Sequence, residues 1–174
     1  MRTPTLYVFS GLPGVGKTTL ARGLCHANGY TYLRIDTLEQ GLRTLTGLPV
    51  EVEGYRLSQR IAADNLNLGT SVVADCVNPI SLSRHEWMDV AQRTHTTCVC
   101  IEVVCTDLDE HRYRIEQRSA DIEGLQLPTW DDVQHRNYEP WSTDVVRIDT
   151  AGRTPEDALQ QMLDRLQRNG LFDP

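Results

Sequence analysis

Short apolar runs alternate along this chain with longer segments in which apolar residues recur every three or four positions. The short runs predict buried strands, and the recurring positions predict the apolar faces of helices. We predict strands at residues 5–9, 31–35, 71–74, 98–104 and 144–148, and helices beginning near residues 17, 37, 57, 83, 107 and 154. Because strands that alternate with helices are typical of a parallel sheet covered on both faces, the pattern predicts one α/β domain over residues 1–174, folded as a three-layer sandwich.

Composition and charge narrow the function classes. The 174 residues are 40% apolar and 24% charged, as in an ordinary globular domain. The formal net charge of −7 argues against binding to duplex nucleic acid, which depends on many cationic contacts with phosphates. Residues 1–4 lead directly into the first strand and no apolar run could cross a bilayer, so we expect a cytoplasmic protein without a membrane partner. The five cysteines lack C-x-x-C spacing, and Cys98 and Cys100, which alternate within an apolar run, are predicted as core residues.

The segment between the first strand and the first helix, G-L-P-G-V-G-K-T, matches the phosphate-loop pattern G-x-x-x-x-G-K-[ST]. Its glycines allow backbone N–H groups to face an anion, and the helix that follows adds the positive end of its dipole. Lys17 is predicted to reach the β- and γ-phosphates, and the Thr18 hydroxyl to bind Mg²⁺. The predicted nucleotide contacts are Gly11, Leu12, Pro13, Gly14, Val15, Gly16, Lys17, Thr18 and Thr19.

Two carboxylates follow predicted strands. Asp36 comes after the second strand and Asp75 after the third, which together with its apolar run has the pattern of a Walker B site. Ligands of open parallel sheets bind at the carboxyl ends of the strands. Asp36 is therefore a candidate to accept a proton from a substrate hydroxyl or to hold Mg²⁺ through water, and Asp75 is a candidate for the metal site. A helix N-cap is the alternative role for Asp36, and both roles can coexist.

Asn78 and Arg84 emerge from the turn and helix after the third strand, and we expect both near the substrate. The start of that helix is predicted from Ser83 and Glu86, which have the spacing of a capping box. Arg84 would then lie in the first turn, where a cation opposes the helix dipole. That local conflict favours a functional role, with a surface position as the alternative.

Arginines gather near the end of the helix predicted at residues 107–118. Arg114 and Arg118 are four residues apart and share one helix face, while Glu110 and Glu116 are alternative partners for ion pairs on the helix surface. The polar stretch 119–141, with its prolines and tryptophans, is predicted to form a lid together with the end of this helix, at about residues 112–141. The D-x-x-G sequence at residues 121–124 lies outside any strand end, and the chain contains no N-K-x-D, so we interpret it as a coincidence rather than a GTPase motif.

With these elements placed, the chain resembles the small P-loop kinases, an AAA-family ATPase-like group that includes polynucleotide kinase 5′-kinase domains, chloramphenicol phosphotransferase, gluconate kinase and adenylylsulfate kinase. The resemblance implies a five-stranded parallel sheet of order 2-3-1-4-5 and ATP with Mg²⁺ as cofactors. It also implies Asp36 as general base and Arg114 and Arg118 as a clamp on the transferring phosphates. The loop after the fifth strand, residues 150–153 with Gly152, would contact the adenine.

We therefore expect a kinase that transfers the γ-phosphoryl group of ATP to a hydroxyl of a small-molecule or nucleotide-like acceptor. One alternative is a nucleotide-dependent switch or assembly ATPase with a protein partner. Another is a 5′-hydroxyl polynucleotide kinase, whose acceptor pocket would need basic residues near Arg34, Arg43, Arg56 and Arg60. The region expected to bind the acceptor matches no motif of any one member of this kinase group. A homodimer is compatible with the sequence.

Overall fold

The computed structural model describes residues 3–172 and contains strands and helices in alternation, as the apolar pattern predicts. The strands are β1 (Thr5–Ser10), β2 (Thr31–Arg34), β3 (Val72–Asp75), β4 (Thr97–Val104) and β5 (Val146–Asp149). The helices are α1 (Lys17–Asn28), α2 (Ile35–Thr46), α3 (Glu53–Asn67), α4 (Ser81–Arg93), α5 (Leu108–Gln117), α6 (Trp130–Gln134) and α7 (Pro155–Arg168). Among the described residues, the helices are too short or too polar to span a lipid bilayer.

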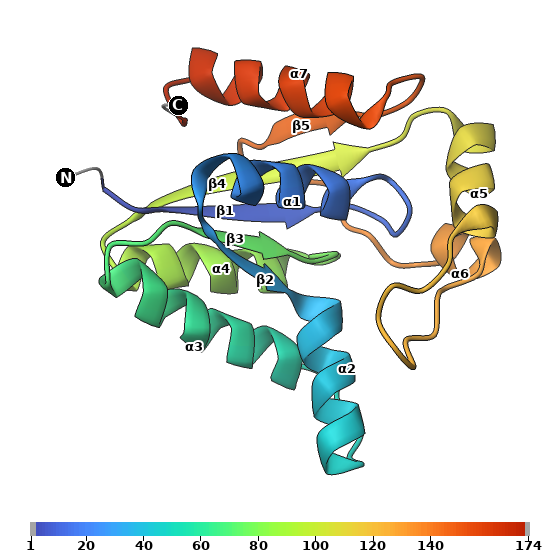
Figure 1. Ribbon diagram of the computed structural model, residues 1–174, viewed down its shortest axis with the longest axis horizontal. Coiled ribbons are helices and arrows are strands. Elements are labelled where there is room, and N and C mark those ends of the chain that lie inside the picture. The colour runs from blue at the N-terminus through green and yellow to red at the C-terminus, as the bar shows by residue number, and fades with distance from the viewer. Residues whose placement is uncertain (1–2, 173–174) are drawn as a thin grey trace.

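The strands form one parallel sheet in the order β2-β3-β1-β4-β5, which confirms the predicted topology. Helices α1 and α7 cover one face of the sheet, and α3 and α4 cover the other (Figure 1). Helices α5 and α6 stand together at the end of the sheet toward which the strand arrows point, while α2 extends away from the sheet (Figure 1). The carboxyl ends of the strands therefore face α5, α6 and the segment between them.

Two apolar clusters, one on each face, hold the sheet between its helices. Alternate side chains of β1 enter different clusters, since Tyr7 and Phe9 pack with α1 and α7 while Leu6 and Val8 pack with α3 and α4. This alternation follows from the period of two in an extended strand. Both faces of β1 are buried, so its sequence reads as a continuous apolar run.

Three local predictions need correction. Strand β2 ends at Arg34, so Asp36 lies inside the first turn of α2, and Arg34 is the N-cap. Helix α4 begins at Ser81, and the Ser83 hydroxyl donates to the carbonyl of Ile80 instead of forming the predicted capping box. Helix α6 was not predicted, because its five residues are too few to show a helical period. Its N-cap is Thr129, which forms a capping box with Asp132.

Candidate functional site

The phosphate loop connects β1 to α1 and depends on glycine at three positions. Gly11, Gly14 and Gly16 have φ angles of 137°, 81° and 97°. A Cβ atom on Gly11 would lie 2.2 Å from the carbonyl oxygen of Val103, and one on Gly14 would lie 2.6 Å from Ile115 Cδ1. Larger residues would therefore meet backbone strain at all three positions and steric overlap at Gly11 and Gly14, which explains why the loop is rich in glycine.

Neighbouring elements hold this loop by its backbone. The N–H of Gly11 donates to the carbonyl of Val77 at 3.1 Å, and Nε2 of His111 on α5 donates to the carbonyl of Pro13 at 2.7 Å. The Thr150 hydroxyl after β5 donates to the carbonyl of Val15 at 2.9 Å. The loop is thus attached to three different parts of the fold before any ligand binds, which reduces the ordering that binding requires.

Lys17 and Thr18 begin α1 on the floor of the cleft. Lys17 is 8% exposed, and its Nζ donates to the carbonyl of Leu12 at 2.8 Å. Burial lowers the pKa of this amine below its ordinary value, while the nearby Asp75 and Asp36 charges act in the opposite direction. Among the described residues, the only hydrogen bond of this buried ammonium is to a carbonyl. Its charge therefore has no anionic hydrogen-bond partner there, which suits it to bind phosphate oxygens.

The predicted metal ligands fit a magnesium site of the phosphate-loop type. The Thr18 hydroxyl donates to Asp75 Oδ2 at 2.7 Å, and the Tyr32 hydroxyl donates to the same oxygen at 2.7 Å. Asp75 is buried at the carboxyl end of β3, next to the start of α1. No cluster of three or more His, Cys, Asp or Glu side chains occurs among residues 3–172, and Mg²⁺ in such sites is bound mainly by substrate phosphates and water.

Asp36 lines the same cleft from the start of α2. Its side chain is 45% exposed, so the carboxylate is accessible to a ligand, and its Oδ2 lies 3.8 Å from Arg34 Nη2. As a residue of the first helical turn, it also interacts favourably with the helix dipole. The structure thus brings Asp36, Asp75, Lys17 and Thr18 to one cleft, as the topology predicts.

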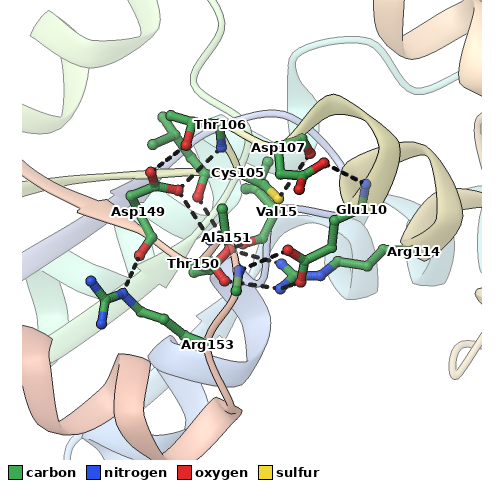
Figure 2. Close-up of polar contacts among 12 residues, drawn as sticks. Val15, Cys105, Thr106, Asp107, Glu110, Arg114, Asp149, Thr150, Ala151 and Arg153 are labelled. Atoms are coloured by element: carbon green, nitrogen blue, oxygen red, sulfur yellow. Dashed lines mark hydrogen bonds and ion pairs between the residues drawn. The ribbon is translucent and has the colours of Figure 1, made fainter.

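Arg114 on α5 contacts the loop after β5. Its guanidinium donates to the Thr150 hydroxyl at 2.8 Å and to the Thr150 carbonyl at 3.0 Å, and it pairs with Glu110 (Figure 2). Glu110 in turn accepts from the N–H of Gly152 at 2.7 Å. Arg114 is therefore held at the loop predicted to contact adenine, and it also lines the cleft that contains the phosphate loop, so its role as a clamp on the transferring phosphates stays a prediction. Arg118, one turn later, lines the cleft and lies near enough to Lys17 to lower the pKa of its amine.

The cleft itself has a volume of about 810 Å³. One end is formed by the phosphate loop, the strand ends and the two arginines of α5. Another part of the cleft, which we call the acceptor end, is lined by residues of α2, α3, α4 and the loop between α2 and α3: Glu39, Arg43, Glu51, Val52, Tyr55, Arg56, Leu82, Ser83 and Glu86. Residues 125–128 of the predicted lid form a third wall.

The structure does not bring Asn78 and Arg84 into this cleft, and their prediction as substrate residues is wrong for this arrangement. Asn78 is fully buried with a φ of 45°, and its amide donates to the carbonyl of Phe9 and to the Ser10 hydroxyl. Arg84 is 3% exposed and lies over the rings of Trp141 and Tyr138, 4.4 and 5.0 Å from their centroids.

The burial of Arg84 has a clear structural purpose. Its guanidinium donates to the carbonyls of Asn78, Glu139 and Pro140, at 3.0, 2.6 and 3.1 Å. It therefore joins the turn after β3 to the segment that returns toward β5. Two of these partners, Glu139 and Pro140, are more than fifty positions away in sequence, so local pattern alone could not identify this role.

Several site residues were missed from sequence. Tyr32 binds Asp75, and Thr150 and His111 hold the phosphate loop. Tyr32 was interpreted only as a strand residue, although its place on β2 beside β3 was a usable signal once the sheet order was inferred. Asp121 pairs with Arg34 and Arg22, although its D-x-x-G context was interpreted as a coincidence.

Comparison with known proteins agrees with this geometry. The chain is 28% identical over 161 residues to a protein of Thermococcus gammatolerans named "Putative adenylate kinase", an alignment that covers 91% of this chain and 84% of that protein. Its fold is similar to a gluconokinase from Sinorhizobium meliloti, with a TM-score of 0.69, 17% identity and coverage of 97% and 95%. It is equally similar to the APS kinase of Mycobacterium tuberculosis in complex with AMPPNP and APS, with a TM-score of 0.69, 18% identity and coverage of 96% and 99%.

The family assignment rests on a match over most of the chain and not on a single motif. The profile of the AAA domain family, AAA_33, matches residues 6–140, from β1 through the phosphate loop, both strand-end carboxylates, α5 and α6. The similar solved structures share the P-loop kinase fold across nearly the whole chain, which confirms the resemblance inferred from sequence. The chain therefore belongs to the AAA domain family AAA_33 and has the fold of the small P-loop kinases.

Proposed function

We propose that this protein is a kinase that uses ATP and Mg²⁺ to transfer the γ-phosphoryl group to a hydroxyl of a small-molecule or nucleotide-like acceptor. The observation that carries the proposal is the accessible carboxylate of Asp36 in the cleft that contains Lys17 and Thr18. A carboxylate at this strand end supports removal of a proton from a hydroxyl as the phosphoryl group is transferred. A nucleotide switch has no need for an acceptor base or for an acceptor end of this size.

The side chains of the cleft divide the chemical tasks. Thr18 and Asp75 would hold Mg²⁺, and the metal would supply positive charge beside the triphosphate. Lys17 would bind the same phosphates and stabilise charge that develops in the transition state. Asp36 would orient the acceptor hydroxyl and take its proton. Tyr32 would act indirectly, because its hydrogen bond fixes the carboxylate of Asp75.

The two arginines of α5 take different roles in this proposal. Arg118 lies close to Lys17 and is the candidate clamp on the transferred phosphoryl group. Arg114 is held by Glu110 and Thr150, beside the loop at Gly152, and would contact the nucleoside side of ATP. Such an arrangement supplies cations on both sides of the triphosphate, as phosphoryl transfer requires.

A phosphate acceptor is a second candidate, favoured by the similarity to the protein named "Putative adenylate kinase" and by Arg56 at the acceptor end. A nucleoside monophosphate is already ionised, so transfer to it would need cations but no general base. The polynucleotide kinase alternative is less well supported. Arg34 and Arg43 already pair with Asp121 and Glu39, and Arg60 does not line the cleft.

A screen with radiolabelled ATP and Mg²⁺ tests these candidates. The acceptors are nucleosides, sugars, antibiotics, short 5′-hydroxyl oligonucleotides and nucleoside monophosphates. Transfer to a hydroxyl that falls at least about 100-fold in Asp36→Asn supports the proposal. Transfer to a nucleoside monophosphate that Asp36→Asn leaves nearly unchanged would instead establish the second candidate. Steady hydrolysis that no acceptor alters would contradict both.

A further inference from the structure

Asp121 connects the segment after α5 to both sides of the cleft. Its carboxylate accepts from Arg34 Nη1 at 2.8 Å, from Arg34 Nη2 at 3.0 Å and from Arg22 Nη2 at 2.9 Å. Arg34 ends β2, whereas Arg22 lies on α1, one turn beyond the phosphate loop. The paired bonds from Arg34 hold the pKa of the Asp121 carboxyl well below its ordinary value, so this group is ionised at neutral pH.

The same segment lies against α2 at a second point. We call residues 119–129 the lid segment. Gly124 has a φ of 76°, and a Cβ atom there would lie 2.9 Å from Gln40 Nε2. The lid segment thus packs against α2, and its residues 125–128 line the cleft. In the described arrangement the lid segment is closed against α2 and forms one wall of the cleft.

Arg34 stands between two carboxylates. Its side chain is 3% exposed, and a charge so deeply buried needs an ionised partner. Asp121 provides this partner at hydrogen-bond distance, while Asp36 Oδ2 stays 3.8 Å from Arg34 Nη2. If Asp121 moved away, Asp36 would be the nearest remaining carboxylate to that guanidinium among the described residues. A direct bond from Arg34 would then occupy an oxygen that the acceptor hydroxyl requires.

We propose that Asp121 is a positioning residue that makes the Asp36 carboxylate available only when the lid segment is closed, by binding Arg34 and so withholding it from Asp36. The proposal rests on the proposed function, in which Asp36 is the acceptor base. Lid closure and base activation would then be one event. A cleft open to water would contain a base already paired with Arg34, which would limit wasteful hydrolysis of ATP.

The Arg22 contact extends this coupling to the phosphate side. The Arg22 guanidinium lies 6.0 Å from the centroid of the Tyr32 ring, and the Tyr32 hydroxyl binds Asp75. The closed lid segment is therefore linked through Arg22 and Tyr32 to Asp75. The Asp75 carboxylate in turn accepts a hydrogen bond from the Thr18 hydroxyl. Asp121 thus reaches the acceptor base through Arg34 and the predicted metal ligands indirectly, through Arg22 and then Tyr32.

The test compares four variants in the transfer assay: Asp121→Ala, Arg34→Gln, the double variant and Glu123→Gln. Glu123 is an exposed acid of the same lid segment that lines no part of the cleft, so it is the matched control. In Asp121→Ala we expect kcat to fall about 10- to 100-fold while the KM for ATP changes little, because misplacement of a reacting group affects the chemical step. Glu123→Gln should stay within about twofold of wild type.

The double variant separates positioning from simple damage to the fold. Without Arg34 no cation competes for Asp36, so the double variant should transfer faster than Asp121→Ala and approach Arg34→Gln. A purely structural role predicts that the second substitution gives no recovery. Wild-type kcat in Asp121→Ala, or a double variant no faster than that single variant, overturns the proposal. Thermal unfolding confirms that each variant is folded before it is assayed.

Limited proteolysis distinguishes failure of this inference from failure of the proposed function. Trypsin can cleave at Arg118 and Arg136, which flank the lid segment. With AMPPNP bound, Asp121→Ala should be cleaved at least about fivefold faster than wild type or Glu123→Gln, because local opening exposes these bonds. A wild-type protein that transfers to no acceptor overturns the proposed function and, with it, activation of Asp36. Cleavage of Asp121→Ala at the wild-type rate overturns the lid contact itself.

Discussion

Lys17 is the only lysine in the sequence, and it is buried at the start of α1. Among residues 3–172, its ammonium forms no ion pair at salt-bridge distance, although Asp75 and Asp36 are close enough to influence its pKa. A buried cation without a bound counterion is destabilising unless a ligand supplies one. The residue therefore contributes more to binding a polyphosphate than to the stability of the free protein.

Substitution of Lys17 by Ala should reduce transfer on the order of 10²- to 10³-fold, because one lost contact with developing charge costs about 2.7–4 kcal/mol. ATP turnover with an identified acceptor measures this loss. Amine-reactive labelling followed by mass spectrometry adds an independent readout, since Lys17 carries the only side-chain amine. ATP with Mg²⁺ should protect it. Activity within about threefold of wild type would remove Lys17 from the mechanism.

Replacement of Asp36 by Asn keeps the shape of the side chain and removes its basicity. The kcat for a hydroxyl acceptor should fall about 10²- to 10⁴-fold, the usual contribution of a general base. The affinity for ATP should change little, because the Asp36 carboxylate lies at the acceptor side of the loop. Titration of ATP binding by calorimetry checks the second point. A parallel loss of kcat and ATP affinity would identify Asp36 as a metal ligand instead.

At the scale of elements, α5 fixes the phosphate loop as well as supplying arginines to the cleft. His111 is buried, donates to the carbonyl of Pro13 and contacts the Trp130 ring of α6, with centroids 5.2 Å apart at 82°. Gly14 of the loop packs against Ile115 of the same helix. Helix α5, helix α6 and the phosphate loop thus form one packed unit, and a change in one of them is transmitted to the nucleotide site.

This packing predicts that the protein loses stability as the pH falls from neutral. Burial lowers the pKa of His111, and the nearby Arg114 and Lys17 charges lower it further, against the hydrogen bond to Pro13. The unfolded chain therefore binds a proton more readily, beginning near pH 6.5. The stabilising contribution of neutral His111 is complete above that pH and is lost as the pH falls through the lower pKa of the folded state.

Thermal unfolding at pH 7.5 and 5.5 tests this expectation. His111→Gln keeps an N–H donor for Pro13 but cannot titrate, so its melting temperature should change less between the two pH values than that of the wild type. In a chain of this size, 1 kcal/mol corresponds to about 2–4 °C. His26 on α1 is an exposed histidine, and His26→Gln is the matched control. Equal pH dependence of wild type and His111→Gln would contradict the assignment.

At the scale of the whole molecule, the parts best predicted from sequence are those defined by continuous local pattern. The five strands, the phosphate loop and the two carboxylates that follow strands were predicted from apolar runs and from the residues that end those runs. The sheet order was predicted from the resemblance to the small P-loop kinases. The errors concern partners distant in sequence. Arg84 was expected in the cleft because a cation in the first turn of a helix opposes the helix dipole. Its carbonyl partners at 139–140 lie more than fifty positions later, so the local pattern did not reveal them. The role of Asp121 becomes visible only in the folded structure, where residues of β2 and α1 both bind its carboxylate.

The behaviour of the lid also distinguishes a kinase from a nucleotide switch, and it is a property of the whole molecule. If closure requires an acceptor, water is excluded from the γ-phosphate only in the productive complex, and hydrolysis of ATP without acceptor should be slow. Arg118→Ala should then depress transfer by about 10²-fold while ATP affinity changes little, because a clamp acts on charge that develops in the transition state. Arg112→Ala is the matched control, since Arg112 pairs with Glu116 on the exposed surface of the same helix.

A nucleotide switch predicts a different set of rates. It would hydrolyse ATP appreciably without an acceptor, respond to a protein partner and be indifferent to small hydroxyl compounds. Hydrolysis by purified protein with ATP and Mg²⁺, measured with and without each candidate acceptor, therefore decides between the two. A rate that rises only with one acceptor, and falls in Arg118→Ala but not in Arg112→Ala, is the result that the closed lid segment, the accessible Asp36 and the buried Lys17 together predict.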